Sequence, residues 1–407
     1  MTASYKTDQW YVSPWNYTEE VTNFFSFPQK IELHDVSLRD GEQQAGIIFT
    51  KEDKIRIAEK LAEAGVHRIE AGMPAVSKDD ELAIKEIVKR NLGPKIFAFC
   101  RCMVEDVKRA LDCGVEGIVI EIPSSDHMIK YAYGWPLQKA IDLSIEATSF
   151  AKENGLYTVF FPIDASRAEI DWFLDLIVKV ATEGHMDALA VVDTFGGLAP
   201  TTIPYLIKKI KEKIKKPLEA HFHDDFSCAA ANTMIALASG CQVAHTTVSA
   251  IGERAGNAPY EEIALGLLTM YGVDTGIKTE KMYEIAKLVQ ELAKISVRPN
   301  RPIVGERLFQ VESGIIAGWI KNAFPEHKLE VTPFLPSLVG QSGPEVVLGK
   351  SSGTPSVEIW LEKLGLTASP EQILEMVNKI KTKAMQTKEL LTEEDFMSIY
   401  KEVVGEN

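Results

Sequence analysis

The feature that most constrains the fold is a regular alternation that runs from about residue 31 to residue 272. Short apolar runs rich in β-branched residues alternate there with longer amphipathic segments. This rhythm is typical of βα units around a parallel sheet. Eight runs are expected to be strands: residues 31–36, 68–72, 96–101, 117–122, 158–163, 189–194, 218–223 and 243–249.

Helix-like segments lie between these runs. The first covers residues 51–64, where Thr50 can cap the start and Gly65 can end the helix. Eight strand and helix pairs over about 240 residues have the size of a closed (β/α)8 TIM barrel. An open doubly wound sheet is the weaker alternative, because no GxGxxG motif opens the first helix. The other expected helices are residues 79–91, 104–113, 136–154, 168–183, 201–214, 227–239 and 260–271.

The rhythm divides the chain into three parts. Residues 1–30 form an N-terminal extension, residues 31–279 the catalytic barrel, and residues 280–407 an α-rich C-terminal extension. In the last part helical stretches flank a segment in which glycine and proline concentrate. We therefore expect an α/β barrel with appended linker subdomains.

Composition excludes several classes of partner. The net charge of −14 argues against nucleic acid or an anionic membrane surface. The first thirty residues lack the pattern of a signal peptide, and no stretch approaches the ~20 apolar residues that span a bilayer. The cysteines form an odd set without CxxC spacing, which favours reduced thiols and a cytoplasmic protein. They are Cys100, Cys102, Cys113, Cys228 and Cys241.

Polar residues at the carboxyl ends of barrel strands face one common cavity. His221 and His223 lie two residues apart at the end of the seventh strand, so both rings can reach one ion. Asp40 follows the first strand and can supply a carboxylate, although a turn aspartate that caps Gly41 is the alternative. Asn257 follows the eighth strand in a glycine-containing loop.

Two histidines, one aspartate and one asparagine form a mixed nitrogen and oxygen set. Such a set suits Mg, Mn or Zn and leaves positions for a chelating substrate such as a 2-oxo acid. Arg39 is next to Asp40 and could stabilise charge that develops on the carbonyl oxygen.

Five ordered motifs carry a family resemblance. The motifs are residues 38–43 (LRDGEQ), 69–74 (IEAGMP), 193–196 (DTFG), 221–225 (HFHDD) and 252–257 (GERAGN). With these motifs the chain resembles the metal-dependent barrel family of 2-isopropylmalate synthase, homocitrate synthase, citramalate synthase and hydroxymethylglutaryl-CoA lyase. A further segment, residues 348–353 (LGKSSG), resembles a glycine-rich part of the synthases' linker subdomains.

The resemblance implies roles for individual residues. Asp40, His221, His223 and Asn257 would bind a divalent metal. Arg39 and Gln43 would contact oxygens of the substrate, Thr194 would bind the carboxylate of the oxo acid, and Glu70 would order the residues around the metal. The GERAGN loop resembles the synthases, whereas the lyases carry a cysteine in that loop. Acetyl-CoA is therefore the expected co-substrate.

The chain departs from the synthases where they carry acid/base groups. Ile163 stands at the position of a fifth-strand glutamate, and Val311 and Ile316 replace two histidines of the following subdomain. An apolar residue cannot provide acid/base catalysis, so another group must serve or the reaction differs. The candidates are Asp164, Glu121, His127, Tyr131 and Glu312.

The identity of the oxo acid stays open. Met73 stands where homocitrate-forming relatives often carry a histidine, which makes a distal carboxylate less favoured. Arg101 at the end of the third strand could still receive one, or it could be a salt-bridge residue. Met73, Arg101 and His127 complete the expected substrate-binding set with Thr194.

We therefore expect a metal-dependent acyltransferase that condenses acetyl-CoA, or another short acyl-CoA, with a small 2-oxo acid. The resemblance of the tail implies a homodimer. One alternative is a carbon–carbon lyase of the hydroxymethylglutaryl-CoA lyase type. The other is a barrel that binds a metabolite without turnover, which the apolar replacement at Ile163 motivates.

Overall fold

The structure is a computed structural model that describes residues 4–405. The chain divides into two compact units. The first comprises residues 14–297 together with Ser4, and the second combines residues 5–13 with the described part of 298–407. No helix among the described residues is long and apolar enough to cross a membrane.

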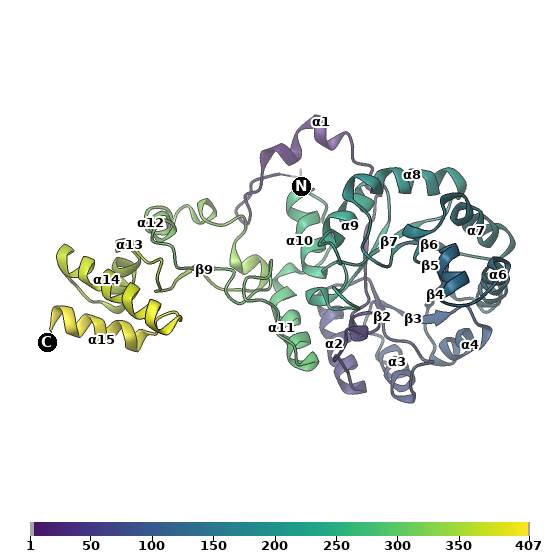
Figure 1. The fold of residues 1–407 in the computed structure, drawn as a ribbon, viewed down its shortest axis with the longest axis horizontal. Helices are drawn as coiled ribbons and strands as arrows, with labels where there is room; N and C mark the ends of the chain where they lie inside the picture. The colour runs from purple at the N-terminus through teal and green to yellow at the C-terminus, as the bar shows by residue number, and fades with distance from the viewer. Residues whose placement is uncertain (1–3, 406–407) are drawn as a thin grey trace. The chain divides into compact units, whose positions relative to one another are not determined.

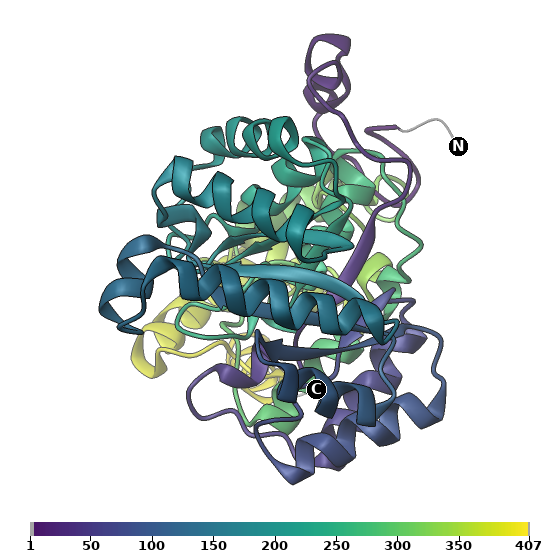
Figure 2. The same cartoon turned by 90° about the vertical axis from the view of Figure 1, so that its right-hand side faces the viewer.

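The first unit is a closed barrel of eight parallel strands in chain order (Figures 1 and 2). The prediction of a (β/α)8 TIM barrel is confirmed. Parallel pairing of β1 with β8 closes the ring, for example between His34 and His245. The strands are β1 (Glu32–Asp35), β2 (Arg68–Glu70), β3 (Lys95–Arg101), β4 (Gly117–Pro123), β5 (Tyr157–Ile163), β6 (Ala188–Asp193), β7 (Leu218–Phe222) and β8 (Val243–Thr246).

The helices of this unit begin and end where local signals predict. Thr50 caps α2 (Lys51–Glu63) in a capping box with Asp53, and Gly65 follows with a positive φ of 86°. The short α5 (Asp126–Tyr131) was not expected from the sequence. The other helices, apart from the four-residue α1 (Glu19–Thr22), are α3 (Lys78–Arg90), α4 (Val104–Cys113), α6 (Leu137–Glu153), α7 (Ile170–Glu183), α8 (Ile203–Lys213), α9 (Ala229–Ala238), α10 (Tyr260–Met270) and α11 (Met282–Ala293).

The interior of the barrel is apolar on one side and polar on the other. Strands β3 to β6 contribute an apolar cluster that includes Phe99, Val119 and Phe161. Strands β1, β7 and β8 instead bury His34, Glu219, His221 and His245. Buried polar groups are costly unless they have partners, so these side chains indicate that the candidate functional site lies on this side of the barrel.

The second unit is mainly helical. A two-stranded parallel sheet pairs β9 (Gln310–Val311) with β10 (Glu345–Val346). Residues 5–13 join this unit through a hydrogen bond from the Tyr11 amide to the Pro333 carbonyl, 2.8 Å long. The helix α11 belongs to the first unit, although its residues fall in the expected tail. The helices of the second unit are α12 (Gly314–Ala323), α13 (Thr354–Leu364), α14 (Pro370–Thr387) and α15 (Glu393–Val404).

Candidate metal centre

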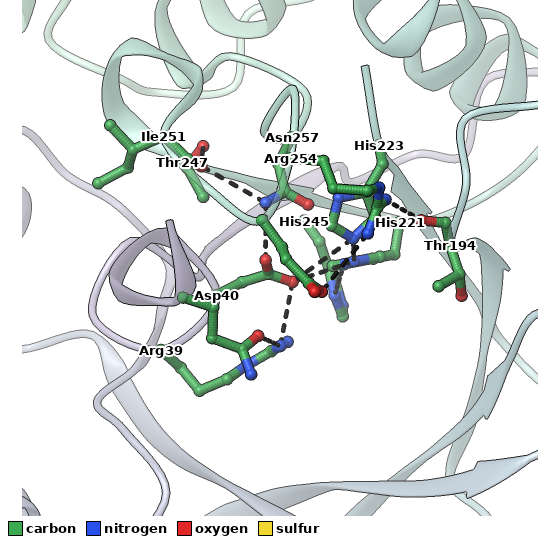
Figure 3. A network of polar contacts seen from close by, with 12 residues as sticks. Arg39, Asp40, Thr194, His221, His223, His245, Thr247, Ile251, Arg254 and Asn257 are labelled. Carbon is green, nitrogen blue, oxygen red and sulfur yellow. Dashed lines mark hydrogen bonds and ion pairs between the residues drawn. The ribbon is translucent and has the colours of Figure 1, made fainter. Parts of the chain in front are cut away.

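Asp40, His221 and His223 come together at the carboxyl-end mouth of the barrel. Asp40 lies in the turn after β1, and His221 and His223 share one face at the end of β7. Asp40 Oδ2 lies 3.4 Å from His221 Nε2 and 3.8 Å from His223 Nε2, and the two Nε2 atoms are 3.4 Å apart. All three side chains are buried and point toward one another (Figure 3).

The charge states of this cluster suit a cation. Burial lowers the pKa of His221 to about 3, so its ring is neutral near pH 7. Burial would raise the pKa of Asp40, but the charge of the neighbouring Arg39 outweighs it and holds this pKa well below its usual range. The cluster therefore offers imidazole lone pairs beside an ionised carboxylate, as divalent metal ligation requires.

Asn257 completes the expected metal set. Its Nδ2 donates to Asp40 Oδ1 at 3.0 Å and to the Ile251 carbonyl at 3.4 Å. Its Oδ1 is buried and has no hydrogen-bond partner among the described residues. An orphaned amide oxygen beside a carboxylate and two imidazoles fits a divalent cation, because the ion would supply the missing partner.

Glycines allow the loop after β8 to reach this position. Gly256 has a φ of 86°, and a Cβ there would lie 1.8 Å from the Ala250 carbonyl oxygen. A Cβ on Gly252 would lie 2.2 Å from Asn257 Nδ2. The amide of Asn257 can approach Asp40 only because neither glycine carries a side chain.

Arg39 lies directly beside the cluster. It donates through Nε to Glu70, and through Nη1 to Asp40 Oδ2 at 3.0 Å and Gln43 Oε1 at 3.3 Å. Its guanidinium lies 3.9 Å from the centroid of the Phe99 ring. Burial lowers the pKa of Arg39, but Glu70 and Asp40 outweigh it, so the charge is kept. Its Nη2 is buried without a partner among the described residues, which leaves one donor for a ligand.

A polar chain beneath His221 was not found from the sequence. His221 Nδ1 lies 3.3 Å from His245 Nδ1, and His245 Nε2 lies 2.8 Å from Glu219 Oε2. Arg68 Nη1 donates to Glu219 Oε1 at 2.8 Å. The available signal was the occurrence of charged residues on β2, β7 and β8 at positions whose side chains point into the barrel.

This chain couples the proton positions of both rings. A Glu219 oxygen that accepts from His245 requires the proton on Nε2, which leaves the lone pair of a singly protonated ring on Nδ1. His221 must then donate from its own Nδ1, and its Nε2 keeps the lone pair that faces Asp40. Glu219 and His245 are also close enough to His34 to form a second potential ligand group. Both are already held by the hydrogen bonds described above.

Arg254 of the GERAGN loop ties three strand ends together, a role that sequence reasoning missed. Its Nε and Nη2 donate to Asp225 at 2.9 and 3.1 Å. Nη2 also donates to the Thr194 carbonyl (Figure 3). Thr194 Oγ1 accepts a hydrogen bond of 2.8 Å from the Asp164 amide. Thr194 therefore lies at the mouth, with its hydroxyl held by the neighbouring loop.

The remaining expected substrate residues are more widely spread. Met73 lines a cavity of about 380 Å³ together with Arg39 and Gln43. Arg101 is bound through Nε and Nη2 to both carboxylate oxygens of Asp106, at 2.7 and 2.9 Å. His127 is 41% exposed and lies 3.6 Å from Asp164, outside the metal cluster.

Comparison with known proteins places the chain in a family. A model of the HMGL-like family matches residues 30–289. The chain belongs to the HMGL-like family. It is 38% identical over 384 residues to a 2-isopropylmalate synthase of Methanocaldococcus jannaschii, covering 93% of this chain and 73% of that protein.

Two further matches extend this result. A homocitrate synthase of Methanothermobacter thermautotrophicus is 34% identical over 397 residues, which cover 98% of this chain and 99% of that protein. The solved structure of an HMG-CoA lyase from Bacillus subtilis aligns with a TM-score of 0.61 at 22% identity, over 67% of this chain and 96% of that one. The structural similarity to the lyase supports the fold alone. The sequence similarity to the two synthases extends over 93% and 98% of this chain.

Proposed function

We propose that this chain is a divalent-metal-dependent acyltransferase that condenses acetyl-CoA, or another short acyl-CoA, with a small 2-oxo acid. The observation that carries the proposal is the convergence of Asp40, His221 and His223 beside the unpartnered Asn257 Oδ1 and Arg39 Nη2. The synthase names of the similar proteins support the reaction class.

Each residue has a proposed part. Asp40, His221, His223 and Asn257 would hold the metal, which when bound supplies Lewis-acid activation of the 2-oxo carbonyl. Arg39 is fixed by Glu70 and directs Nη2 to the oxygen on which charge develops. Thr194 and Gln43 would orient the carboxylate and carbonyl of the oxo acid.

The cavity beside Arg39 favours an oxo acid with an apolar side chain. Its lining includes Met73, Phe49 and Val76. The second cation that lines it, Lys54, is bound to Glu42 at 2.7 Å and to Asp80. A distal carboxylate would have to compete with these acids, so pyruvate or 2-oxoisovalerate should be preferred over oxaloacetate or 2-oxoglutarate.

The test is thiol-reagent detection of CoA release from acetyl-CoA by metal-loaded protein, with each of these four oxo acids in turn. Release that depends on one acid and disappears after chelation is expected. Cleavage of 3-hydroxy-3-methylglutaryl-CoA without any condensation would replace the synthase with a lyase. Tight metal-dependent binding of an oxo acid without turnover of any thioester would indicate a binding protein.

Substitution of one metal ligand makes the same test specific. His223→Ala should abolish metal binding and CoA release together, because the variant removes one of two imidazole ligands. His185→Ala is the matched control. His185 precedes β6 at the opposite end of the barrel and pairs with Asp187 at 3.1 Å. Full activity of His223→Ala would contradict the metal assignment.

We also propose that the protein is a cytoplasmic homodimer. The described cysteines are all free, which fits a reducing compartment. Ile315 and Trp319 lie four residues apart on α12 and are 71% and 53% exposed, so they form an apolar pair that a second copy could cover. A sedimentation mass of one chain at micromolar concentration would count against the dimer.

A further inference from the structure

Condensation of an acyl thioester with a 2-oxo acid requires removal of a proton from the carbon next to the thioester. Most acids and histidines near the mouth are already engaged. Asp40, His221 and His223 form the metal cluster, and Glu70 accepts from Arg39. The base must be a group that faces the cavity and is free to accept a proton.

Three further candidates from the sequence are excluded by their contacts, exposure or position. Asp164 accepts two hydrogen bonds from Arg167, at 2.6 and 3.0 Å, and one from Ser125 at 2.7 Å. Tyr131 is 77% exposed. Glu312 lies in the second unit, where it accepts from the Ser351 amide at 2.8 Å.

Glu121 has the required position. It lies near the end of β4, next to Arg101 of β3 and Phe161 of β5 in the parallel register. Strand alternation places its side chain on the same inward face as Val119. Glu121 is only partly buried and lines a cavity of about 340 Å³ with Tyr133 and Arg101. Its side chain therefore borders open space at the end of β4.

The strands that flank Glu121 carry the aromatic rings around the reaction centre. The Phe161 ring lies 4.8 Å from the His221 ring, centroid to centroid. The Arg39 guanidinium lies 3.9 Å from the centroid of Phe99 and 5.9 Å from that of Phe161. Glu121 occupies the strand between those of Phe99 and Phe161, so it borders the space that Arg39 faces.

The carboxylate of Glu121 makes no hydrogen bond or ion pair with the described residues. The nearby cations are committed elsewhere, Arg101 to Asp106 and Arg39 to Glu70. Burial raises the pKa of Glu121 to about 7. Arg39 and Arg101 oppose this rise, while Asp106 and Glu70 add to it. Glu121 also faces Tyr133, whose own pKa is raised by burial. A base with a pKa near the working pH is the efficient choice.

We propose that Glu121 is the catalytic base of the condensation, an inference that rests on the proposed function. A carboxylate oxygen of Glu121 takes a proton from the methyl carbon of acetyl-CoA, and the C–H electron pair forms the enolate. The enolate carbon bonds to the 2-oxo carbon, whose carbonyl electron pair moves to the oxygen that Arg39 faces. A proton from solvent neutralises that oxygen, and water then cleaves the thioester and releases CoA.

The experiment compares wild type, Glu121→Gln, Glu121→Ala and Tyr133→Phe, all loaded with Mn²⁺. Tyr133→Phe is the matched control, because it changes the same cavity without removing a carboxylate. We expect Glu121→Gln to lose about 10²–10⁴-fold in kcat. Its affinity for the accepted oxo acid, measured by calorimetry without acetyl-CoA, should stay at the wild-type value. Formate should partly restore the turnover of Glu121→Ala, which a structural role would not allow.

The outcomes separate this inference from the proposed function. Absence of CoA release by wild type with every oxo acid of the panel would refute the synthase and the base together. Glu121→Gln with a wild-type kcat would refute the base alone. Loss of oxo-acid binding in Glu121→Gln would also overturn it, because Glu121 would then recognise that substrate. A wild-type kcat that falls below about pH 7, with the fall absent from residual Glu121→Gln turnover, would support it.

Discussion

Replacing Glu219 by glutamine should weaken metal binding without touching a metal ligand. Glu219 is fully buried, and its two oxygens accept from His245 and Arg68 at 2.8 Å each. A glutamine that keeps its oxygen toward Arg68 turns its NH₂ group toward His245 Nε2. That nitrogen must then accept, His245 Nδ1 becomes a donor, and His221 is driven to the tautomer with a proton on Nε2. This tautomer cannot bind a metal.

The magnitude follows from the hydrogen bonds involved. Loss of the partner that orients a metal-binding histidine typically costs about 10–100-fold in metal affinity. This corresponds to about 1.4–2.7 kcal/mol. Turning the glutamine over would avoid the tautomer change but set its NH₂ against Arg68, leaving a buried charge-assisted hydrogen bond unmade at a cost of about 1.5–3 kcal/mol. Either arrangement therefore disfavours the state in which His221 Nε2 carries a lone pair for the metal.

The assay is calorimetric titration of metal-free protein with Mn²⁺, beside a urea unfolding curve of the metal-free form. Glu32→Gln is the matched control, because Glu32 also accepts from Arg68, at 2.7 Å, but does not contact His245. We expect Glu219→Gln to bind Mn²⁺ more weakly and Glu32→Gln to bind like wild type. Equal affinity of Glu219→Gln and wild type, or equal losses in both variants, would refute the tautomer argument.

Three other predictions follow from the same geometry. Arg39→Lys should lower kcat by about 10²–10³-fold while metal affinity stays near wild type, because a lysine cannot reach Glu70, Asp40 and a ligand at once. Steady-state kinetics and Mn²⁺ titration would check this prediction, and an unchanged kcat would contradict it. Gly256→Ala should lose metal binding, because its Cβ would lie 1.8 Å from the Ala250 carbonyl oxygen and displace Asn257. Gly134→Ala is the control for the strain of an alanine at positive φ, because nothing lies within 4 Å of its Cβ. Glu121→Gln should stabilise the protein at pH 8 to 9 but not near pH 4, because a folded-state pKa of about 7 against an ordinary 4.5 makes ionised Glu121 unfavourable in the fold. That cost is absent below the unfolded pKa, complete above the folded one, and at most about 3 kcal/mol; urea unfolding at both pH values would show it, and the same stability difference at both would disprove it.

Much of the fold could be predicted from the sequence because the barrel repeats one local unit, an apolar strand followed by an amphipathic helix. Thr50 and Gly65 bound α2, the first helix of the βα repeat, and the apolar runs mark all eight strands. The convergence of Asp40 and the two histidines of β7 follows from the same repeat, since a closed barrel brings the ends of β1 and β7 to one mouth.

What the sequence could not supply are the partners of long charged side chains. Arg101 had two open interpretations, and only the packing shows that Asp106 accepts from its Nε and Nη2. His127 stays a predicted substrate residue, and only the structure shows that it lies in the short α5 segment, 3.6 Å from Asp164. The connection from His221 to Glu219 depends on the stagger between neighbouring strands, which a one-dimensional pattern does not encode.

The pairing of residues 5–13 with the second unit has a consequence for how the protein is made. The Tyr11 amide donates to the Pro333 carbonyl, so a segment translated before the barrel finds its partner only after the barrel and residue 333 have left the ribosome. Until then, residues 5–13 stay unpaired with the second unit while the barrel folds. Deletion of residues 5–13 should therefore disturb the second unit while the barrel folds as before.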